Sequence, residues 1–239
     1  MSETVRKEFN ENEISDLNVE IGAAELIFVE NDRKDAVTVI LKDGEEDIFS
    51  AEKEGERLDI FYKKNGKVQK GDKLEQLVVM LPGEKQLKNV SITNGAGETK
   101  IQQPGLRCDD MRLVIGAGKL KAEQLEVSGN MKVEVGAGKA KFEEVHTGNL
   151  ILEAGIGKCS YKGAVEHNMK VSCGVGKVEA VLSGKESNYN YNISCGLGKV
   201  KVNGKVFGSV ASESIITDAQ TKDTIYLECG LGKIDIKTQ

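Results

Sequence analysis

The stretch MKVEVGAGKAKFEEV, from Met131 to Val145, holds the pattern that decides the fold of this chain. It places the tetrapeptide Gly-Ala-Gly-Lys between two short segments in which apolar and polar residues alternate. A glycine-rich sequence ending in lysine occurs in loops that cradle phosphate groups, but it also suits a sharp bend between two strands. The rest of the chain distinguishes these two interpretations.

The tetrapeptide recurs at a nearly constant spacing. Gly-x-Gly-Lys occurs six times, and the related Gly-Ala-Gly-Glu and Gly-Ala-Ala-Glu occur once each. Their first glycines are Gly22, Gly95, Gly116, Gly136, Gly155, Gly174, Gly196 and Gly230. The spacing from Gly95 to Gly196 is roughly 20 residues, which is typical of stacked repeats. The longer interval before Gly230 predicts an enlarged loop at 207–223.

Around each bend the sequence has a period of two. In the quoted copy Val133 and Val135 flank Glu134, and Ala140 and Phe142 follow the lysine on alternate positions. This alternation is typical of strands with one buried face. Glycine at both bend positions is expected to supply backbone angles closed to other residues and to leave room for the next layer.

These repeats predict an all-β fold, because one strand–bend–strand unit cannot bury its own apolar face and must stack. We expect a single-stranded β-solenoid, or β-helix, of roughly 20-residue coils with Gly-x-Gly corners. The chain is predicted to be a single domain, residues 1–239. Residues 1–89 would form N-terminal strands, a β-meander that caps the stack, and 90–239 would form the solenoid repeats.

The phosphate-loop interpretation fails on two points. A phosphate-binding loop of the Walker type needs a hydroxyl residue after the lysine and a helix after the loop. The residues that follow the lysines are Leu120, Ala140, Cys159, Val178, Val200 and Ile234, and a strand pattern continues from each. No nucleotide or other cofactor is therefore expected.

The lysines themselves form the candidate binding site. They occupy one repeat position, so stacking would align them about 5 Å apart. This ladder consists of Lys119, Lys139, Lys158, Lys177, Lys199 and Lys233. Like charges at this spacing repel unless acids or a bound anion intervene. The ladder is either a solvated rim or a linear site for a polyanion, such as an anionic envelope polymer or a lipid surface.

The cysteines do not indicate a metal site or a disulfide framework. The five cysteines are an odd number without CxxC spacing, which favours a reducing compartment. Cys173, Cys195 and Cys229 share one inward position without a histidine, so zinc is not expected. They are predicted to be small buried hydrophobic residues, with a redox-sensitive pair as the alternative.

Catalytic residues are not indicated either. His146 and His167 lie at unlike repeat positions. Arg107, Asp109, Asp110 and Arg112 invite comparison with carbohydrate-active β-helix enzymes, but these acids share one turn, where aspartate is common. We therefore expect no enzyme.

Composition restricts the class of protein further. The chain has 239 residues, is 39% hydrophobic and carries a mild net charge of −5, which argues against a nucleic-acid binder. No apolar run is long enough for a membrane span, and the polar start does not resemble a signal peptide. This predicts a cytoplasmic protein, with the cell envelope as the alternative.

Three segments carry a resemblance to a known family. They are LEQLVVMLPGEKQLKNVSITNGAGETKI (Leu74–Ile101), VEVGAGKAKF and VSCGVGKVEA. With them the chain resembles the putative adhesin family of bacterial β-strand-repeat proteins (domain of unknown function 4097). The resemblance implies a β-rich N-terminal portion, a non-enzymatic role and an envelope context, and it implies no functional residues.

Together these observations predict a non-catalytic binding or scaffold module that is envelope-associated and adhesin-like. Its partner would be an unknown protein or an anionic polymer. One alternative is a cytoplasmic partner of a membrane or regulatory protein in envelope-stress signalling. The other is a carbohydrate-active β-helix enzyme. The ligand, the handedness and the oligomeric state are left open by the sequence.

Overall fold

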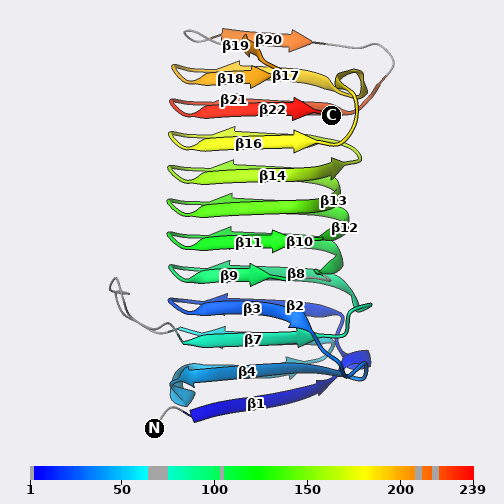
Figure 1. Cartoon of the computed structure of the whole chain (residues 1–239), viewed down its shortest axis with the longest axis vertical. Coiled ribbons are helices and arrows are strands. Elements are labelled where there is room, and N and C mark those ends of the chain that lie inside the picture. Colours follow the sequence, from blue (N-terminus) through cyan, green and yellow to red (C-terminus); the bar gives the residue numbers. More distant parts are fainter. Residues whose placement is uncertain (1–2, 64–74, 103–104, 208–211, 217–220) are drawn as a thin grey trace.

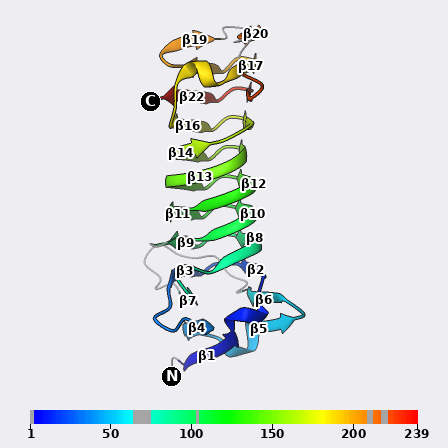
Figure 2. The same cartoon turned by 90° about the vertical axis from the view of Figure 1, so that its right-hand side faces the viewer.

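A computed structural model of the chain describes residues 3–63, 75–102, 105–207, 212–216 and 221–239. Every strand in these residues belongs to one mixed sheet of 22 strands. The sheet folds over on itself, so that two layers face each other across a long, narrow core (Figures 1 and 2).

Each layer contains strands from the whole length of the chain. In stacking order, the first layer contains β5 (Phe49–Glu54), β6 (Arg57–Tyr62), β2 (Asp16–Ile21), β8 (Gln86–Asn94), β10 (Arg107–Ile115), β12 (Glu126–Val135), β15 (Met169–Cys173), β21 (Thr224–Cys229), β17 (Asn190–Cys195) and β20 (Ser212–Ile216). The second layer contains β1 (Glu3–Asn10), β4 (Ala36–Gly44), β7 (Gln76–Leu81), β3 (Glu25–Glu30), β9 (Glu98–Ile101), β11 (Lys119–Glu123), β14 (Lys158–Val165), β16 (Lys177–Leu182), β22 (Lys233–Thr238), β18 (Lys199–Val202) and β19 (Lys205–Phe207). The 16-residue β13 (Lys139–Ala154) belongs to both layers.

Helical structure in the described residues is limited to three short 3₁₀ turns. These are η1 (Glu11–Glu13), η2 (Glu46–Ile48) and η3 (Glu186–Asn188). Each lies in a connection and buries no residue, so the core is built by strands alone.

The basic unit is an arch, which we define as a strand, a Gly-x-Gly bend and a strand in the opposite layer. Successive arches pair in parallel and in register, as where Leu113 of β10 faces Val133 of β12. The hydrogen-bond ladder continues through the bends, where the N–H of Ala117 donates to Gly95 O at 2.8 Å. Residues 16–30 form a further arch around Gly22, which stacks on the arch at Gly95.

The bend glycines are required by crowding between arches. A Cβ on Gly138 would lie 2.3 Å from the carbonyl oxygen of Gly118, in the arch below. The first glycine of a bend is less confined, since a Cβ on Gly155 would lie 3.1 Å from Gly136 O. The expected lack of space is therefore confirmed. The expected unusual backbone angles are wrong, because none of these four glycines has φ in the left-handed region.

The alternation in the sequence predicted the buried positions, and the burial confirms them. Val133, Leu152 and Val171 are at most 1% exposed and form a column through consecutive arches. Phe142 and Tyr161 face the core from the second layer, with their ring centroids 6.3 Å apart. Each fully buried aliphatic or aromatic side chain contributes roughly 1.5–3 kcal/mol. Each arch is therefore stabilised by stacking, which buries apolar side chains that an isolated arch would expose.

The predicted architecture, a single-stranded β-solenoid with Gly-x-Gly corners and a meander cap, is wrong, although the chain does bend at the Gly-x-Gly sequences. The observed fold is one mixed sheet, nearly closed around its core like a flattened barrel. β13 runs from one layer into the other without interruption. Antiparallel pairs lie at both ends, joining β1 to β4, β4 to β7, β5 to β6, β17 to β20 and β18 to β19.

The stacking order also departs from the sequence order. The last arch of the chain, β21–β22, lies between the arches β15–β16 and β17–β18. Near the other end, β2 pairs with β6 and with β8, and β3 pairs with β7 and with β9. A period of 20 residues specifies the shape of each arch, but any arch with the same period can be its neighbour. The sequence therefore could not predict this order.

The expected enlarged loop at 207–223 contains a strand. Ser212–Ile216 forms β20, which pairs with β17 in an antiparallel direction and covers the end of the first layer. Residues 208–211 and 217–220 of the expected loop lie outside the described residues.

Candidate binding surface

The predicted lysines lie side by side in the second layer. Each is the first residue of its strand, immediately after the bend. In-register pairing between neighbouring strands connects them, at the inter-strand spacing of about 4.8 Å. In stacking order this lysine row is Lys119, Lys139, Lys158, Lys177, Lys233 and Lys199. The sequence predicted the members of the row, and the structure exchanges the order of the last two.

Most of the row has no acidic partner among the described residues. Lys177 forms an ion pair with Glu179, at 2.5 Å between Nζ and Oε1. The other five lysines form no ion pair with any residue that the structure describes. Two positions further along the strands the charges are mixed, and there Lys121 pairs with Glu123 and Lys141 with Glu143. Positive charge in excess of its partners is therefore concentrated next to the bends.

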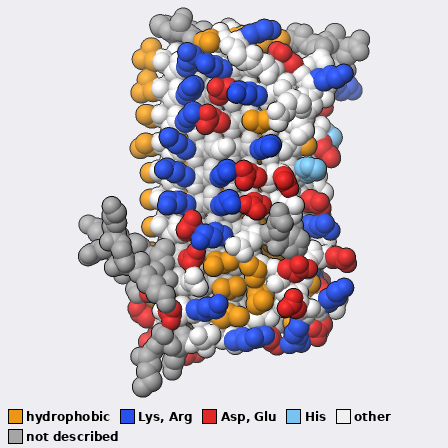
Figure 3. Space-filling model, in the orientation of Figure 1, with side chains coloured by type: hydrophobic (Ala, Val, Ile, Leu, Met, Phe, Trp, Pro, Cys, Tyr) orange, Lys and Arg blue, Asp and Glu red, His pale blue; other side chains and the backbone are white. Residues whose placement is uncertain are grey.

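A line of apolar side chains borders the lysine row. The middle residue of each Gly-x-Gly bend points to solvent, and in four consecutive arches it is a large aliphatic residue. This apolar ridge consists of Ile156, Val175, Leu231 and Leu197, which are 72, 58, 60 and 69% exposed. Figure 3 shows hydrophobic side chains projecting along the edge of the bends, with a column of Lys and Arg beside them.

The pattern of glycines and lysines in the repeat does not by itself indicate the ridge. The signal was present in the middle residue, which is alanine at the bends of Gly95, Gly116 and Gly136 and a large aliphatic residue at the next four bends of the stack. All seven sequences form the same kind of bend, so the change from alanine to larger residues is not required by the fold.

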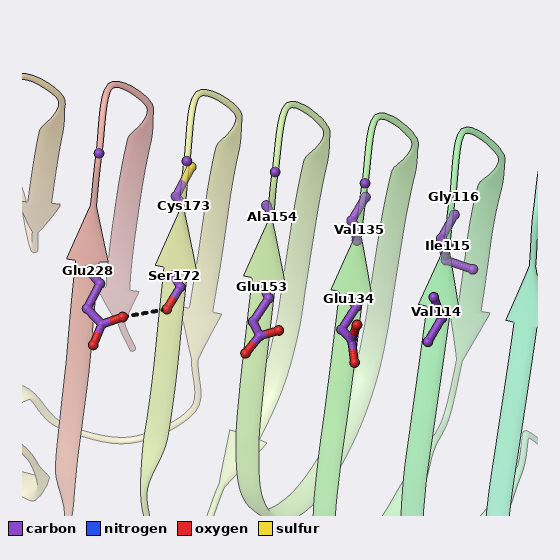
Figure 4. Close-up of a pocket in the computed structure, with 14 residues that line it drawn as sticks. Val114, Ile115, Gly116, Glu134, Val135, Glu153, Ala154, Ser172, Cys173 and Glu228 are labelled. Atoms are coloured by element: carbon purple, nitrogen blue, oxygen red, sulfur yellow. Dashed lines mark hydrogen bonds between the residues drawn. The ribbon is translucent and has the colours of Figure 1, made fainter.

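The first layer presents a different surface on the other side of the ridge. A shallow groove of about 610 Å³ runs across consecutive strands there, and Glu134, Glu153, Ser172 and Glu228 line it (Figure 4). Ser172 donates a hydrogen bond to the carboxylate of Glu228 at 2.8 Å. Acidic side chains thus gather on this side of the bends.

These acids are paired with basic residues of the same layer. Lys132 lies 3.1 Å from a carboxylate oxygen of Glu134 and 3.5 Å from one of Glu153, and the two acids raise the pKa of Lys132. Lys170 lies 2.9 Å from Glu228, whose pKa is lowered by hydrogen bonds from Lys170 and Ser172. The groove is therefore close to neutral, whereas the lysine row is not.

The charged residues considered for catalysis are used in structural contacts. Asp109 accepts hydrogen bonds from Ser128 Oγ and from Gln86, both at 3.0 Å. Asp110 accepts from the backbone and side-chain nitrogens of Asn130 at 2.8 Å. These acids connect neighbouring arches. They lie within strand β10, where its pairing with β12 shifts register between Cys108 and Met111, so the predicted turn at these positions is wrong.

The remaining candidates are two arginines that form ion pairs and two histidines that lie on neighbouring arches. Arg107 pairs with Glu126 at 3.1 Å, and Arg112 pairs with Glu134 at 2.8 Å. His146 lies in β13 opposite Ala164, whereas His167 lies beyond β14, with its backbone N–H bonded to Gly148 O. The two histidines thus lie on neighbouring arches, and among the described residues neither forms a hydrogen bond or ion pair with Asp109 or Asp110.

The inward-facing cysteines stack in one column. Cys229 lies between Cys173 and Cys195, in register with both. All five cysteines of the chain are free and buried. Burial raises the pKa of Cys229 to about 11, so this thiol remains protonated at neutral pH. Within the described residues no group of three or more His, Cys, Asp or Glu side chains is arranged to hold a metal ion.

No family model and no curated protein matches the chain. Several solved structures have a similar fold. A "putative adhesin" from Bacteroides fragilis superimposes with a TM-score of 0.51 at 14% identity, covering 99% of this chain and 97% of that one. A "putative cell adhesion protein" from Clostridium sporogenes gives 0.46 at 17% identity over the whole of both chains. A "putative adhesin" from Parabacteroides distasonis gives 0.45 at 12%, covering 99% and 97%.

At these low sequence identities, the similarity to the solved structures shows a similar fold and nothing about function. The chain is similar in architecture to the Bacteroides fragilis protein, and membership of the family named from the sequence is not established by it. Among the described residues no helix is long and apolar enough to cross a membrane.

Proposed function

We propose that this chain is a non-catalytic binding module that holds an anionic ligand along the lysine row. The observation that supports this proposal is the alignment of six lysines in register, five of them without an ion pair to any described residue. Neighbouring lysines repel one another at this spacing, and an anion lying along the row would relieve the repulsion.

The proposal agrees with two further observations. Asp109 and Asp110, the acids that invite comparison with carbohydrate-active enzymes, bond to neighbouring arches and so contribute to the fold. The Bacteroides fragilis protein of similar fold is described as a "putative adhesin", and adhesion is a binding function. An adhesin-like role would place the chain at the cell envelope.

A cytoplasmic role as the partner of a membrane or regulatory protein is the second candidate. Its support is the set of five free, buried thiols, which is usual in a reducing compartment. Cell fractionation distinguishes the two, because recovery of the native protein in the cytosol alone would exclude adhesion.

Binding to dextran sulfate, a simple polyanion, tests the lysine row. Immobilised dextran sulfate should capture the protein with an affinity that falls steeply as salt rises, since exposed charges are screened over about 10 Å at 0.1 M. Lys139→Gln plus Lys158→Gln should weaken capture at least about tenfold, because it removes two of the charges that attract the polymer.

The matched control removes two lysines from the N-terminal end. Lys53 and Lys88 pair with Glu13 and Glu56, away from the row. Lys53→Gln plus Lys88→Gln changes the net charge by the same amount and should alter capture less than about twofold, as expected of screened, distant charges. Salt-insensitive capture, or equal effects of the two double variants, would contradict the proposal.

A further inference from the structure

We propose that the anionic ligand is a lipid bilayer containing anionic lipids, which the chain contacts edge-on with the apolar ridge directed into the membrane interface. This inference rests on the proposed function, because the lysine row supplies the attraction to the headgroups. The ridge adds a requirement that a soluble polyanion does not meet, namely an apolar interior for aliphatic side chains.

The apolar ridge supports the membrane proposal independently of the lysine row, because the fold does not require large aliphatic side chains at the bends. Alanine at three other bends of the same stack supports the same arch, so nothing in the bend demands a side chain as large as Ile156 or Leu231. Both are at least 60% exposed and contribute little to the core. Contiguous exposed apolar side chains on a soluble protein usually mark an interaction site.

The position of the ridge suits a membrane. Four neighbouring side chains at the inter-strand spacing of about 4.8 Å form a line roughly 15 Å long on the narrow edge of the sheet. Aliphatic side chains of interfacial proteins enter the boundary between headgroups and acyl chains to a depth of about 5–10 Å. The bends lie at the ends of the strands of both layers, so their side chains can reach this depth while the faces of the two layers stay outside the membrane.

The charges next to the ridge complement an anionic headgroup layer. Each ridge residue is followed two positions later by a lysine of the row, from Lys158 to Lys199. Lysine can extend its ammonium group to the headgroups while its aliphatic stem follows the apolar surface. On the opposite side, Glu153 and Glu228 are already paired with Lys132 and Lys170, so the approach is not opposed by free carboxylates.

A direct test uses the absence of tryptophan from the chain. Leu231→Trp places one fluorophore on the ridge, and Val206→Trp places one on β19 at another exposed apolar position, 54% exposed. Vesicles of equal parts phosphatidylglycerol and phosphatidylcholine should shift the emission of the first variant to shorter wavelength and leave the second unchanged. Brominated acyl chains should quench the first variant alone.

A second test measures sedimentation with the same vesicles. Ile156→Ser plus Leu231→Ser should lower partitioning at least about tenfold, because aliphatic groups that enter the interface are removed. The control, Val206→Ser plus Ile215→Ser, removes similar exposed side chains from β19 and β20 and should change partitioning less than about twofold. Lys139→Gln plus Lys158→Gln should lower it about thirtyfold, at roughly fivefold for each lysine.

The outcomes separate this inference from the proposed function. Capture by dextran sulfate without binding to the vesicles overturns the membrane inference and leaves the lysine row standing, whereas binding to neither overturns both. Vesicle binding that the ridge variant leaves unchanged also overturns the inference. Analytical ultracentrifugation provides a further test. A wild-type dimer that the ridge substitutions dissociate would also overturn the inference, because the ridge would then be a contact between two copies.

Discussion

The two glycines of one bend should differ sharply in their tolerance of alanine. In the arch around Gly155 and Gly157, a Cβ on Gly157 would lie 2.4 Å from the carbonyl oxygen of Gly138 and 2.8 Å from Cγ1 of Val135. A Cβ on Gly155 would approach its nearest neighbour, Gly136 O, at 3.1 Å. The first contact requires a displacement of most of an ångström, and the second requires a few tenths.

The displacement at Gly157 is expensive because its neighbours are already bonded. Gly138 O accepts the N–H of Lys158 at 3.0 Å, so moving it stretches a rung of the ladder. Overpacking costs roughly 1–3 kcal/mol, and a weakened hydrogen bond adds about 1 kcal/mol. Gly157→Ala should therefore lower the free energy of unfolding by about 2–4 kcal/mol.

Gly155→Ala should change stability by less than about 1 kcal/mol. Its mild crowding is offset by the smaller conformational freedom of alanine in the unfolded chain, worth about 0.4–1 kcal/mol. Urea denaturation followed by far-ultraviolet circular dichroism measures both variants. Equal losses in the two variants, or a larger loss for Gly155→Ala, would refute the reasoning that close approach between arches selects glycine.

Three further predictions follow from buried or paired groups. The native protein should react with a disulfide reagent at pH 8 far more slowly than the denatured protein, which exposes five thiols, and rapid reaction of the folded chain would contradict the burial of Cys108, Cys159, Cys173, Cys195 and Cys229. The pKa of Glu25 lies below its usual 4.5 because Lys100 donates a hydrogen bond to it, so its contribution is complete above pH 4.5 and is lost as the pH falls below that value. Glu25→Gln should consequently lower the urea midpoint more at pH 7 than at pH 3, whereas an equal effect at both pH values would exclude this pairing as the cause. Asn94→Ala should lower the free energy of unfolding by about 1–3 kcal/mol, because Asn94 is fully buried and bonds to the N–H of Gly97 at 2.8 Å and to Thr99 at 2.7 Å; an unchanged urea midpoint would show that water replaces both bonds.

The candidate site was only half predictable from the sequence. The lysine row was found because Lys119 and its equivalents share one position in a repeat, and position is a local property. The apolar ridge was missed because Ile156 and Val175 look unremarkable as single residues and become a surface only when their arches lie side by side. The pairing of Lys170 with Glu228 was equally hidden, since β21 reaches β15 from the far end of the chain.

The sequence by itself determined the local elements. Alternation of apolar and polar residues specified the strands and their buried faces, and the paired glycines specified the bends, because both depend on neighbours within a few residues. Only the tertiary structure decided how the arches are arranged. The insertion of β21–β22 between β15–β16 and β17–β18, the antiparallel strands at both ends and the passage of β13 from layer to layer depend on which sheet edges meet. Arches of one period and similar faces can pair in several orders, so that choice is made by contacts between residues far apart in the chain.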